Sequence, residues 1–196
     1  MEKKHLQKGM YGFHAYKKKT EIIKTLILFG IALAVYFTGL LHTKTNKNLL
    51  TVVAIVGMLP ASKSAVSMLM FLRFKSAAAS LHDQLTDYWK QSGKQGILLY
   101  DLILVIKEKV VKTDCIWIQN TTVLVYTVNT QLSQQDISKE LKNFLSNHGK
   151  GGCTIKVCKT EKTFLEFLKN HSAEEPEEQA VQNQEKIREM LLGYSM

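Results

Sequence analysis

Three acidic residues in the middle of the chain, Asp101, Glu108 and Asp114, are the side chains whose types and spacing could do chemistry. Carboxylates that lie close together can hold Mg²⁺ and polarise a phosphate. The three residues fall on or beside two stretches that have the composition of strands, and paired strands could bring them together. If they converge in one pocket, we expect an enzyme. If they stay apart, they provide no catalytic group.

The cysteines are a second set of candidate ligands. Cys115, Cys153 and Cys158 could be joined by His148 as ligands of a zinc ion, but no CxxC pair is present. Cys153 and Cys158 lie on either side of a short predicted strand, so their side chains should diverge. We interpret all three as buried structural thiols of a reducing compartment, and we expect no disulfide.

The glycine-rich stretch HGKGG, residues 148–152, has some likeness to a phosphate-binding loop. A phosphate-binding loop of the GxxxxGK[ST] type lies between a strand and a helix, so that the helix N-terminus faces the phosphate. Here a predicted helix comes first and a strand follows, which is the opposite order. We therefore interpret the stretch as a turn. No GxSxG motif is present either, and the sequence names no catalytic, cofactor-binding or metal-binding residue.

Residues 76–171 have the pattern of a small α/β domain. Apolar residues at helical or strand spacing predict the order α-β-β-β-α-β-α. The predicted elements are a helix over 80–91, strands over 97–106, 114–119 and 123–128, a helix over 133–147, a strand over 154–158 and a helix over 161–169. Ser133 is expected to cap the second helix and Gly149 to end it.

This order of elements resembles the core of the PD-(D/E)xK nuclease fold, in its variants related to the NERD domain. In that family an Asp begins the second strand and an E-x-K motif ends the third. Here Asp114 is followed by Thr127-Val128-Asn129 at similar spacing, with Thr and Asn in place of Glu and Lys. The resemblance implies an inactive, scaffold-like relative, because the second carboxylate and the catalytic lysine are missing.

Two apolar stretches precede the domain and predict a transmembrane helical hairpin over residues 22–75. Residues 22–41 and 49–68 are each twenty residues long, and twenty helical residues span about 30 Å, the thickness of a hydrocarbon core. The apolar core of the first stretch is too long for a cleaved signal peptide, and a second stretch follows at once. The polar linker of residues 42–48 is short enough to require an antiparallel pair.

The charge distribution predicts the orientation of this hairpin. The chain has a net charge of +9, and six lysines lie in residues 1–21, which we expect to be a basic cytoplasmic tail. Only Lys44 and Lys47 lie in the linker. The positive-inside rule therefore predicts a multi-pass protein of the cell membrane with both termini in the cytoplasm. Because the hairpin flanks explain most of the basic charge, we expect no nucleic-acid partner.

The second apolar stretch contains two unusual residues. Pro60 lacks a backbone donor and should kink the helix. Lys63 is expected to extend its side chain to the cytoplasmic interface; a polar contact with the first helix and a transport role are the alternatives. Beyond residue 68 the helix is expected to continue along the membrane surface.

Small residues lie on one side of each apolar helix. They are Gly30 and Ala34 on the first and Ala54, Gly57, Ala61 and Ala65 on the second. Small residues let helix backbones approach closely. We expect them to pack the hairpin on itself, with homo-oligomerisation through the same faces as the alternative.

Residues 172–196 form an acidic segment that we expect to be partly helical and either mobile or docked on a partner. The whole chain also resembles uncharacterised two-span membrane proteins of Gram-positive bacteria, a likeness carried by NLLTVVAIVGMLPASKSAV (residues 48–66). Such proteins are sometimes labelled glycosyltransferase-like, but no nucleotide-sugar motif is present. We therefore expect a membrane-tethered interaction or regulatory protein with a protein partner and no cofactor. A membrane-bound enzyme, nuclease-like or transferase-like, is the alternative.

Overall fold

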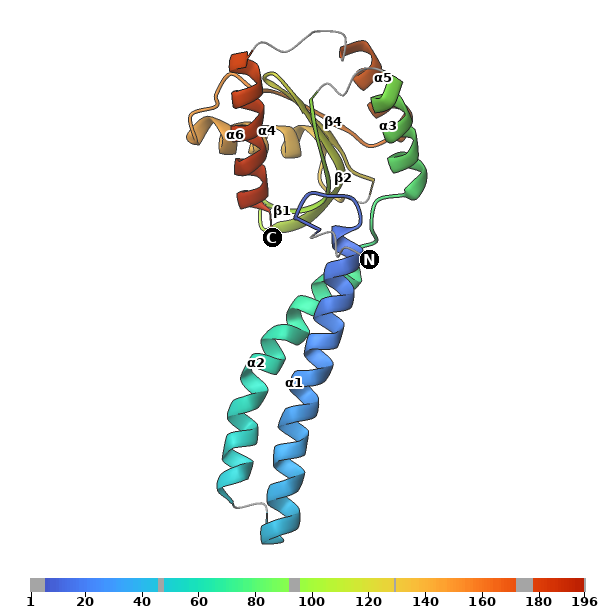
Figure 1. Ribbon diagram of the computed structural model, residues 1–196. Helices are drawn as coiled ribbons and strands as arrows, with labels where there is room; N and C mark the ends of the chain where they lie inside the picture. Colours follow the sequence, from blue (N-terminus) through green and yellow to red (C-terminus); the bar gives the residue numbers. More distant parts are fainter. Residues whose placement is uncertain (1–5, 46–47, 92–95, 129, 172–177, 196) are drawn as a thin grey trace. The chain divides into compact units, whose positions relative to one another are not determined.

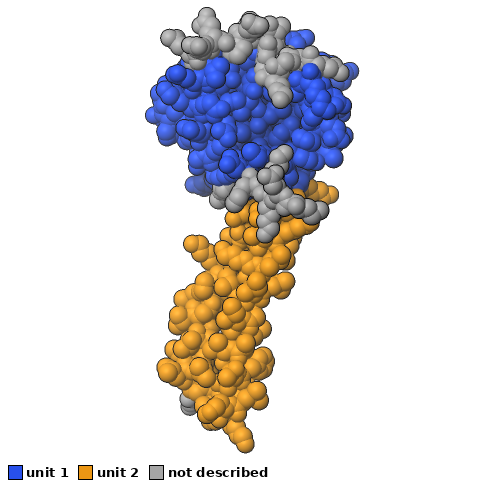
Figure 2. Space-filling model, viewed as in Figure 1, with its two compact units in different colours: residues 1–13, 76–196 blue, residues 14–75 orange. Residues whose placement is uncertain are grey.

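The computed structural model describes residues 6–45, 48–91, 96–128, 130–171 and 178–195. It contains α1 (Phe13–Thr43), α2 (Leu49–Arg73), α3 (Ala79–Gln91), β1 (Ile97–Ile106), β2 (Lys109–Gln119), β3 (Thr122–Tyr126), α4 (Gln134–Asn147), β4 (Thr154–Cys158), α5 (Glu161–His171) and α6 (Glu178–Tyr194). The chain divides into two compact units, shown in Figure 2. The first unit contains residues 1–13 and 76–196, and the second contains residues 14–75.

The second unit is an antiparallel pair of long helices, α1 and α2 (Figure 1). Both are long and apolar enough to cross a membrane, judged by length and composition. Helix α1 begins at Phe13, well before the apolar run at Ile22, because no glycine or proline separates the basic residues from that run. The expectation that residues 1–21 form a tail is therefore wrong from Phe13 onward. Helix α2 continues through Pro60 and is capped by the side chain of Asn48.

The two helices face each other through small side chains. The buried positions on the facing sides include Thr25, Ala32 and Gly39 of α1 and Ala54, Ala61 and Ser64 of α2. The hydroxyl oxygens of Thr25 and Ser64 lie 3.0 Å apart and form a buried hydrogen bond. The prediction of small residues inside the hairpin is confirmed for Ala54 and Ala61.

The same prediction is wrong for Gly30 and Ala34, which are exposed. Ala32 and Gly39 lie seven residues apart and therefore share one face of α1, which is the face that meets α2. Gly57 and Ala65 are partly buried. The inward face of α1 is thus rotated away from the glycine-alanine pair that its sequence suggested.

Replacing Gly39 with leucine is expected to destabilise the hairpin, while the same change at Gly30 should be neutral. A Cβ atom at Gly39 would lie 2.7 Å from the Cβ of Leu50, whereas a Cβ at Gly30 would meet nothing within 4 Å. Forcing extra atoms into a packed contact costs about 1–3 kcal/mol. Thermal unfolding of the full chain in detergent measures the difference between Gly39→Leu and Gly30→Leu. Equal stability of the two variants would contradict the close approach.

The first unit contains a four-stranded sheet in the order β1-β2-β3-β4. Strand β2 is antiparallel to both β1 and β3, and β4 is parallel to β3. Lys107 and Glu108 form the tight turn between β1 and β2, with positive φ angles of 47° and 62°. Because this turn lets both strands continue to its edge, β2 begins at Lys109. The expectation that the second strand begins at Asp114 is wrong.

Helices cover both faces of the sheet, giving the α/β mixed fold expected from the sequence (Figure 1). One core packs α4 and α6 against the sheet, and its helical residues are Ile137, Leu141, Leu145, Ile187 and Leu191. The other core packs α3 and α5, and its helical residues are Leu81, Leu85, Phe164 and Leu168. Ser133 caps α4 as predicted, since its hydroxyl accepts the N–H of Asp136 at 3.0 Å.

Both ends of the chain contribute to the first unit. The side chains of Ile187 and Leu191 on α6 are fully buried, so the prediction of a mobile or partner-docking tail is wrong for the described residues 178–195. Residues 172–177 of this acidic segment lie outside the described residues. At the N-terminus, the Lys8 ammonium donates to the carbonyls of Leu192 and Ser195 at 2.9 and 2.6 Å, and burial lowers the pKa of this lysine.

Candidate functional site

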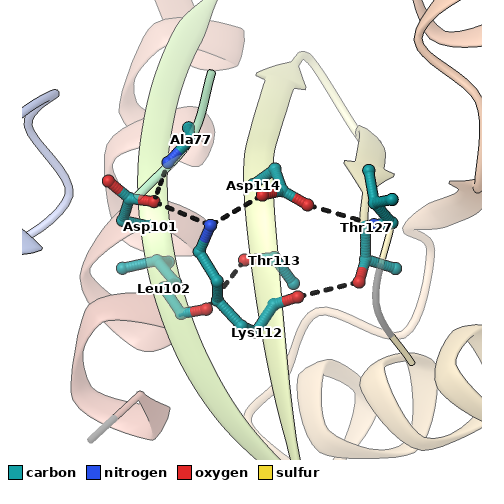
Figure 3. A network of polar contacts seen from close by, with 8 residues as sticks. Ala77, Asp101, Leu102, Lys112, Thr113, Asp114 and Thr127 are labelled. Atoms are coloured by element: carbon teal, nitrogen blue, oxygen red, sulfur yellow. Dashed lines mark hydrogen bonds and ion pairs between the residues drawn. The ribbon is translucent and has the colours of Figure 1, made fainter. Parts of the chain in front are cut away.

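A buried ion cluster on β1 and β2 is the strongest candidate site in the domain (Figure 3). The Lys112 ammonium lies 3.1 Å from an Asp101 carboxylate oxygen and 2.6 Å from an Asp114 carboxylate oxygen. The side chains are 8%, 0% and 15% exposed, respectively. The cluster therefore holds one positive and two negative charges away from bulk water.

Backbone groups complete the cluster. The N–H of Ala77 donates to the same Asp101 oxygen at 2.7 Å, and the N–H of Val128 donates to the other Asp114 oxygen at 3.0 Å. The hydroxyl of Thr127 donates to the carbonyl of Lys112 at 2.7 Å. The cluster thus ties β1 and β2 both to the segment that precedes α3 and to the end of β3.

Asp101 has a backbone conformation that is unusual for a strand. Its φ angle is 55°, in the left-handed region that Asp and Asn tolerate better than most residues. It faces Asp114 across the β1–β2 ladder, between the pairs Tyr100↔Cys115 and Leu102↔Thr113. Such a residue interrupts the regular alternation of side chains along a strand.

The interruption changes which residues reach each core. In β1, Tyr100 packs on the α3–α5 side, but Leu102 packs on the α4–α6 side, although two residues of a regular strand would share a face. In β2, Val111 and Cys115 are likewise separated onto opposite faces. The ion cluster therefore lies where the sheet exchanges its two faces, which makes it central to the fold.

The three candidate acids do not converge. Asp101 and Asp114 both contact Lys112, but Glu108 is exposed in the turn between β1 and β2. Within the described ranges, no three His, Cys, Asp or Glu side chains are placed to share a metal ion. An ammonium group occupies the position between the two carboxylates that a divalent cation would need. The cluster is therefore built for internal charge pairing.

One atom of the cluster lacks a partner. The second carboxylate oxygen of Asp101 is buried without a hydrogen bond to any described group. Leaving a buried acceptor unsatisfied costs about 1–3 kcal/mol. This unpaired oxygen therefore lowers the stability of the fold. The other oxygen of Asp101 accepts from the N–H of Ala77 and pairs with the Lys112 ammonium.

The residues that carried the nuclease resemblance are near each other. Thr127 and Val128 follow the end of β3 and reach β2 beside Asp114 through the hydrogen bonds given above. Asn129 lies outside the described residues. Asp114 stands inside β2 instead of at its beginning, and the lysine beside it comes from β2 itself. This placement provides no carboxylate from β3 to pair with Asp114.

The ion cluster affects the titration of its neighbours. Burial raises the pKa of the Cys115 thiol well above its ordinary value, and the charges of Asp114 and Asp101 raise it further. Burial raises the pKa of Tyr126, and the charges of Asp114 and Glu161 raise it further.

Burial also raises the pKa values of the other two thiols, Cys153 and Cys158. All three thiols are therefore protonated and poorly nucleophilic at neutral pH.

The cysteines and the glycine-rich stretch of residues 148–152 lie where their spacing in the sequence predicts. Cys153 packs in the α4–α6 core and Cys158 in the α3–α5 core, so their side chains diverge across the sheet. All three cysteines are free thiols. Residues 148–152 connect the end of α4 to β4, which confirms the predicted turn and the order of helix before strand.

Lys112 was missed in the sequence, although a signal existed. The segment KVVKTDC places a lysine and an aspartate two residues apart in a strand, where alternate side chains share a face. Its counterpart Asp101 interrupts an otherwise apolar run in β1. A charge inside such a run requires a partner of opposite sign.

No protein-family model, curated protein or solved structure matches this chain.

Proposed function

We propose that this protein is a membrane-tethered interaction or regulatory module, in which α1 and α2 cross the cell membrane and the α/β domain binds a protein partner in the cytoplasm. The apolar outer surface of the hairpin is the observation that supports its insertion into the membrane. Large apolar side chains are exposed along both helices, among them Leu26, Ile31, Phe37, Leu41, Ile55, Val56 and Leu59. Water does not favour so large a continuous apolar surface, whereas lipid does.

The orientation follows from the basic residues. Lys17, Lys18 and Lys19 lie near the beginning of α1, and Arg73 ends α2, so positive charge gathers at the end of the hairpin that joins the domain. This distribution supports a cytoplasmic location for both termini and for the domain.

The interaction role rests on the ion cluster. Apart from the second oxygen of Asp101, its charged groups are paired with one another or with backbone N–H groups, an arrangement that supports a structural role instead of action on a substrate. The domain thereby serves as a rigid body that presents a surface at the membrane. A nuclease-like activity would require Asp114 to hold a metal ion in place of Lys112.

Membrane fractionation tests the tether. The full chain is expected to remain with the membrane pellet after washing with high salt and then with alkaline carbonate, because both remove proteins held only by charge. Release into the supernatant would contradict the proposal.

Crosslinking in these membranes, together with an assay for cleavage of DNA with Mg²⁺, tests the interaction role. We expect a crosslinked protein partner and no cleavage. Cleavage that is lost in Asp114→Ala, with no crosslinked partner, would favour the enzyme.

A further inference from the structure

Two lysines within the apolar part of the hairpin, Lys24 and Lys63, lie at nearly the same level. The hydrogen bond between Thr25 of α1 and Ser64 of α2 fixes the register of the two helices, and the rings of His14 and Phe71 meet near the beginning of α1 and the end of α2, with centroids 5.4 Å apart. Lys24 and Lys63 each precede one residue of the hydrogen-bonded pair. Because the helices are antiparallel, these two steps run in opposite directions, and the two lysine backbones lie about 3 Å apart along the hairpin axis.

The two lysines also project to the same side. One residue back along an α-helix is a rotation of about 100°. Because the helices are antiparallel, this rotation has opposite senses in the two, so it carries both side chains from the contact to a single side of the pair. Both lysines are exposed. Packed helix axes lie about 8–10 Å apart. Two lysine side chains are long enough for both ammonium groups to reach the same ligand group across that separation.

The hairpin offers these lysines no acidic partner. Glu21 is the single acid in residues 14–75 of the sequence. It is buried, and its carboxylate lies 3.1 Å from the ammonium of Lys17. A pair of cations in an apolar setting requires an anion from elsewhere.

The position of the pair indicates which anion this is. Leu49 to Lys63 covers about 21 Å of helix at 1.5 Å per residue, which places Lys63 about 9 Å from the far boundary of a 30 Å hydrocarbon core. A lysine side chain covers most of that distance. Beyond Lys63, Val66 and Leu69 are still exposed apolar residues, 68% and 61% accessible. The ammonium groups therefore extend toward the phosphates of the cytoplasmic leaflet.

We propose that Lys24 and Lys63 together bind the phosphate of one anionic phospholipid of the cytoplasmic leaflet. This inference rests on the proposed membrane insertion and specifies the lipid that the hairpin prefers. The lipid would bridge α1 and α2 on one side of the hairpin, beside the Thr25–Ser64 contact.

The test measures lipid binding by the full chain in a neutral detergent. Phosphatidylglycerol is titrated against the wild type, Lys24→Gln, Lys63→Gln and the double variant, and affinity is read from retained lipid by native mass spectrometry. Each substitution should weaken binding about fivefold, since one lysine at a membrane surface contributes about 1 kcal/mol. Phosphatidylcholine and inorganic phosphate run in parallel, and neither should reproduce the binding.

A Lys18→Gln/Lys19→Gln variant is the matched control, because it removes the same charge from the same end of α1. These lysines lie five or six residues from Lys24, about a Debye length away, so the effect should be at most about twofold. Equal losses in the control and in the Lys24–Lys63 double variant would overturn the paired site.

The outcomes separate this inference from the proposed function. If the wild type leaves the membrane in the carbonate wash, the tether itself fails. If it stays, but the Lys24–Lys63 double variant binds phosphatidylglycerol like the wild type, only the lipid site fails. Loss of a crosslinked membrane protein from that variant, with lipid binding unchanged, would assign the lysines to an acidic helix instead and would also overturn the lipid site.

Discussion

Replacing Lys112 with methionine is expected to lower the free energy of unfolding by about 3–5 kcal/mol, the usual cost of removing one partner from a buried ion pair. Methionine keeps the length and apolar character of the lysine stem, so little packing is lost. The substitution leaves the carboxylates of Asp101 and Asp114 together, without the ammonium that now lies 3.1 and 2.6 Å from them. Chemical denaturation of the full chain in detergent, followed by the fluorescence of buried Trp117, measures the change.

Two further variants make this expectation specific. Lys109→Met removes a lysine from the exposed beginning of the same strand and should change the stability by less than about 0.5 kcal/mol. Neutralising the aspartates as well, in Asp101→Asn/Lys112→Met/Asp114→Asn, should recover much of the loss, because no uncompensated charge remains. A Lys112→Met protein as stable as Lys109→Met would show that the cluster contributes little.

A series at Asp101 should separate its side chain from its backbone. Asp101→Ala removes both the acceptor of the Ala77 N–H and a charge partner of Lys112, and it places alanine at a φ angle of 55°. Asp101→Gly removes the same contacts but tolerates that φ angle. Asp101→Asn retains an acceptor and also tolerates it. We expect stability to fall in the order Asn, Gly, Ala, with alanine about 1–2 kcal/mol below glycine.

The same denaturation experiment ranks the three variants. The difference between glycine and alanine reports the left-handed backbone, and the difference between asparagine and glycine reports the lost acceptor. If alanine and glycine were equally stable, the exchange of faces in β1 would not depend on the conformation of Asp101.

The elements of the domain could be predicted from the sequence because most of them are strongly patterned. The stripe of Ile137, Leu141 and Leu145 predicts α4, and the cap at Ser133 gives its beginning. The beginning of β2 was harder to predict. Lys107 and Glu108 adopt positive φ angles without the Asn or Gly that usually marks such a turn.

The charges of the ion cluster leave a signal in the sequence, but its geometry could not be predicted, for a related reason. Its geometry depends on a left-handed residue inside β1, which moves Leu102 to the opposite face from that of a regular strand. A period of two along the sequence gives no sign of such an interruption. Similarly, the apolar residues of α6 form only a thin stripe, and its place in the core is evident only once β1 and β2 provide the surface for Ile187 and Leu191.

The proposed hairpin crosses the membrane and leaves the domain in the cytoplasm, and cysteine labelling tests this topology. The three native thiols provide a silent background, because they are buried and burial raises their pKa values. Single cysteines are introduced at Thr45, in the connection between α1 and α2, and at Lys90, on α3; both positions are exposed.

A membrane-impermeant maleimide is then applied to intact cells that express the full chain. We expect Thr45→Cys to be labelled in intact cells and Lys90→Cys to be labelled only after the membrane is opened. Labelling of Lys90→Cys in intact cells, with Thr45→Cys protected until the membrane is opened, would contradict this topology.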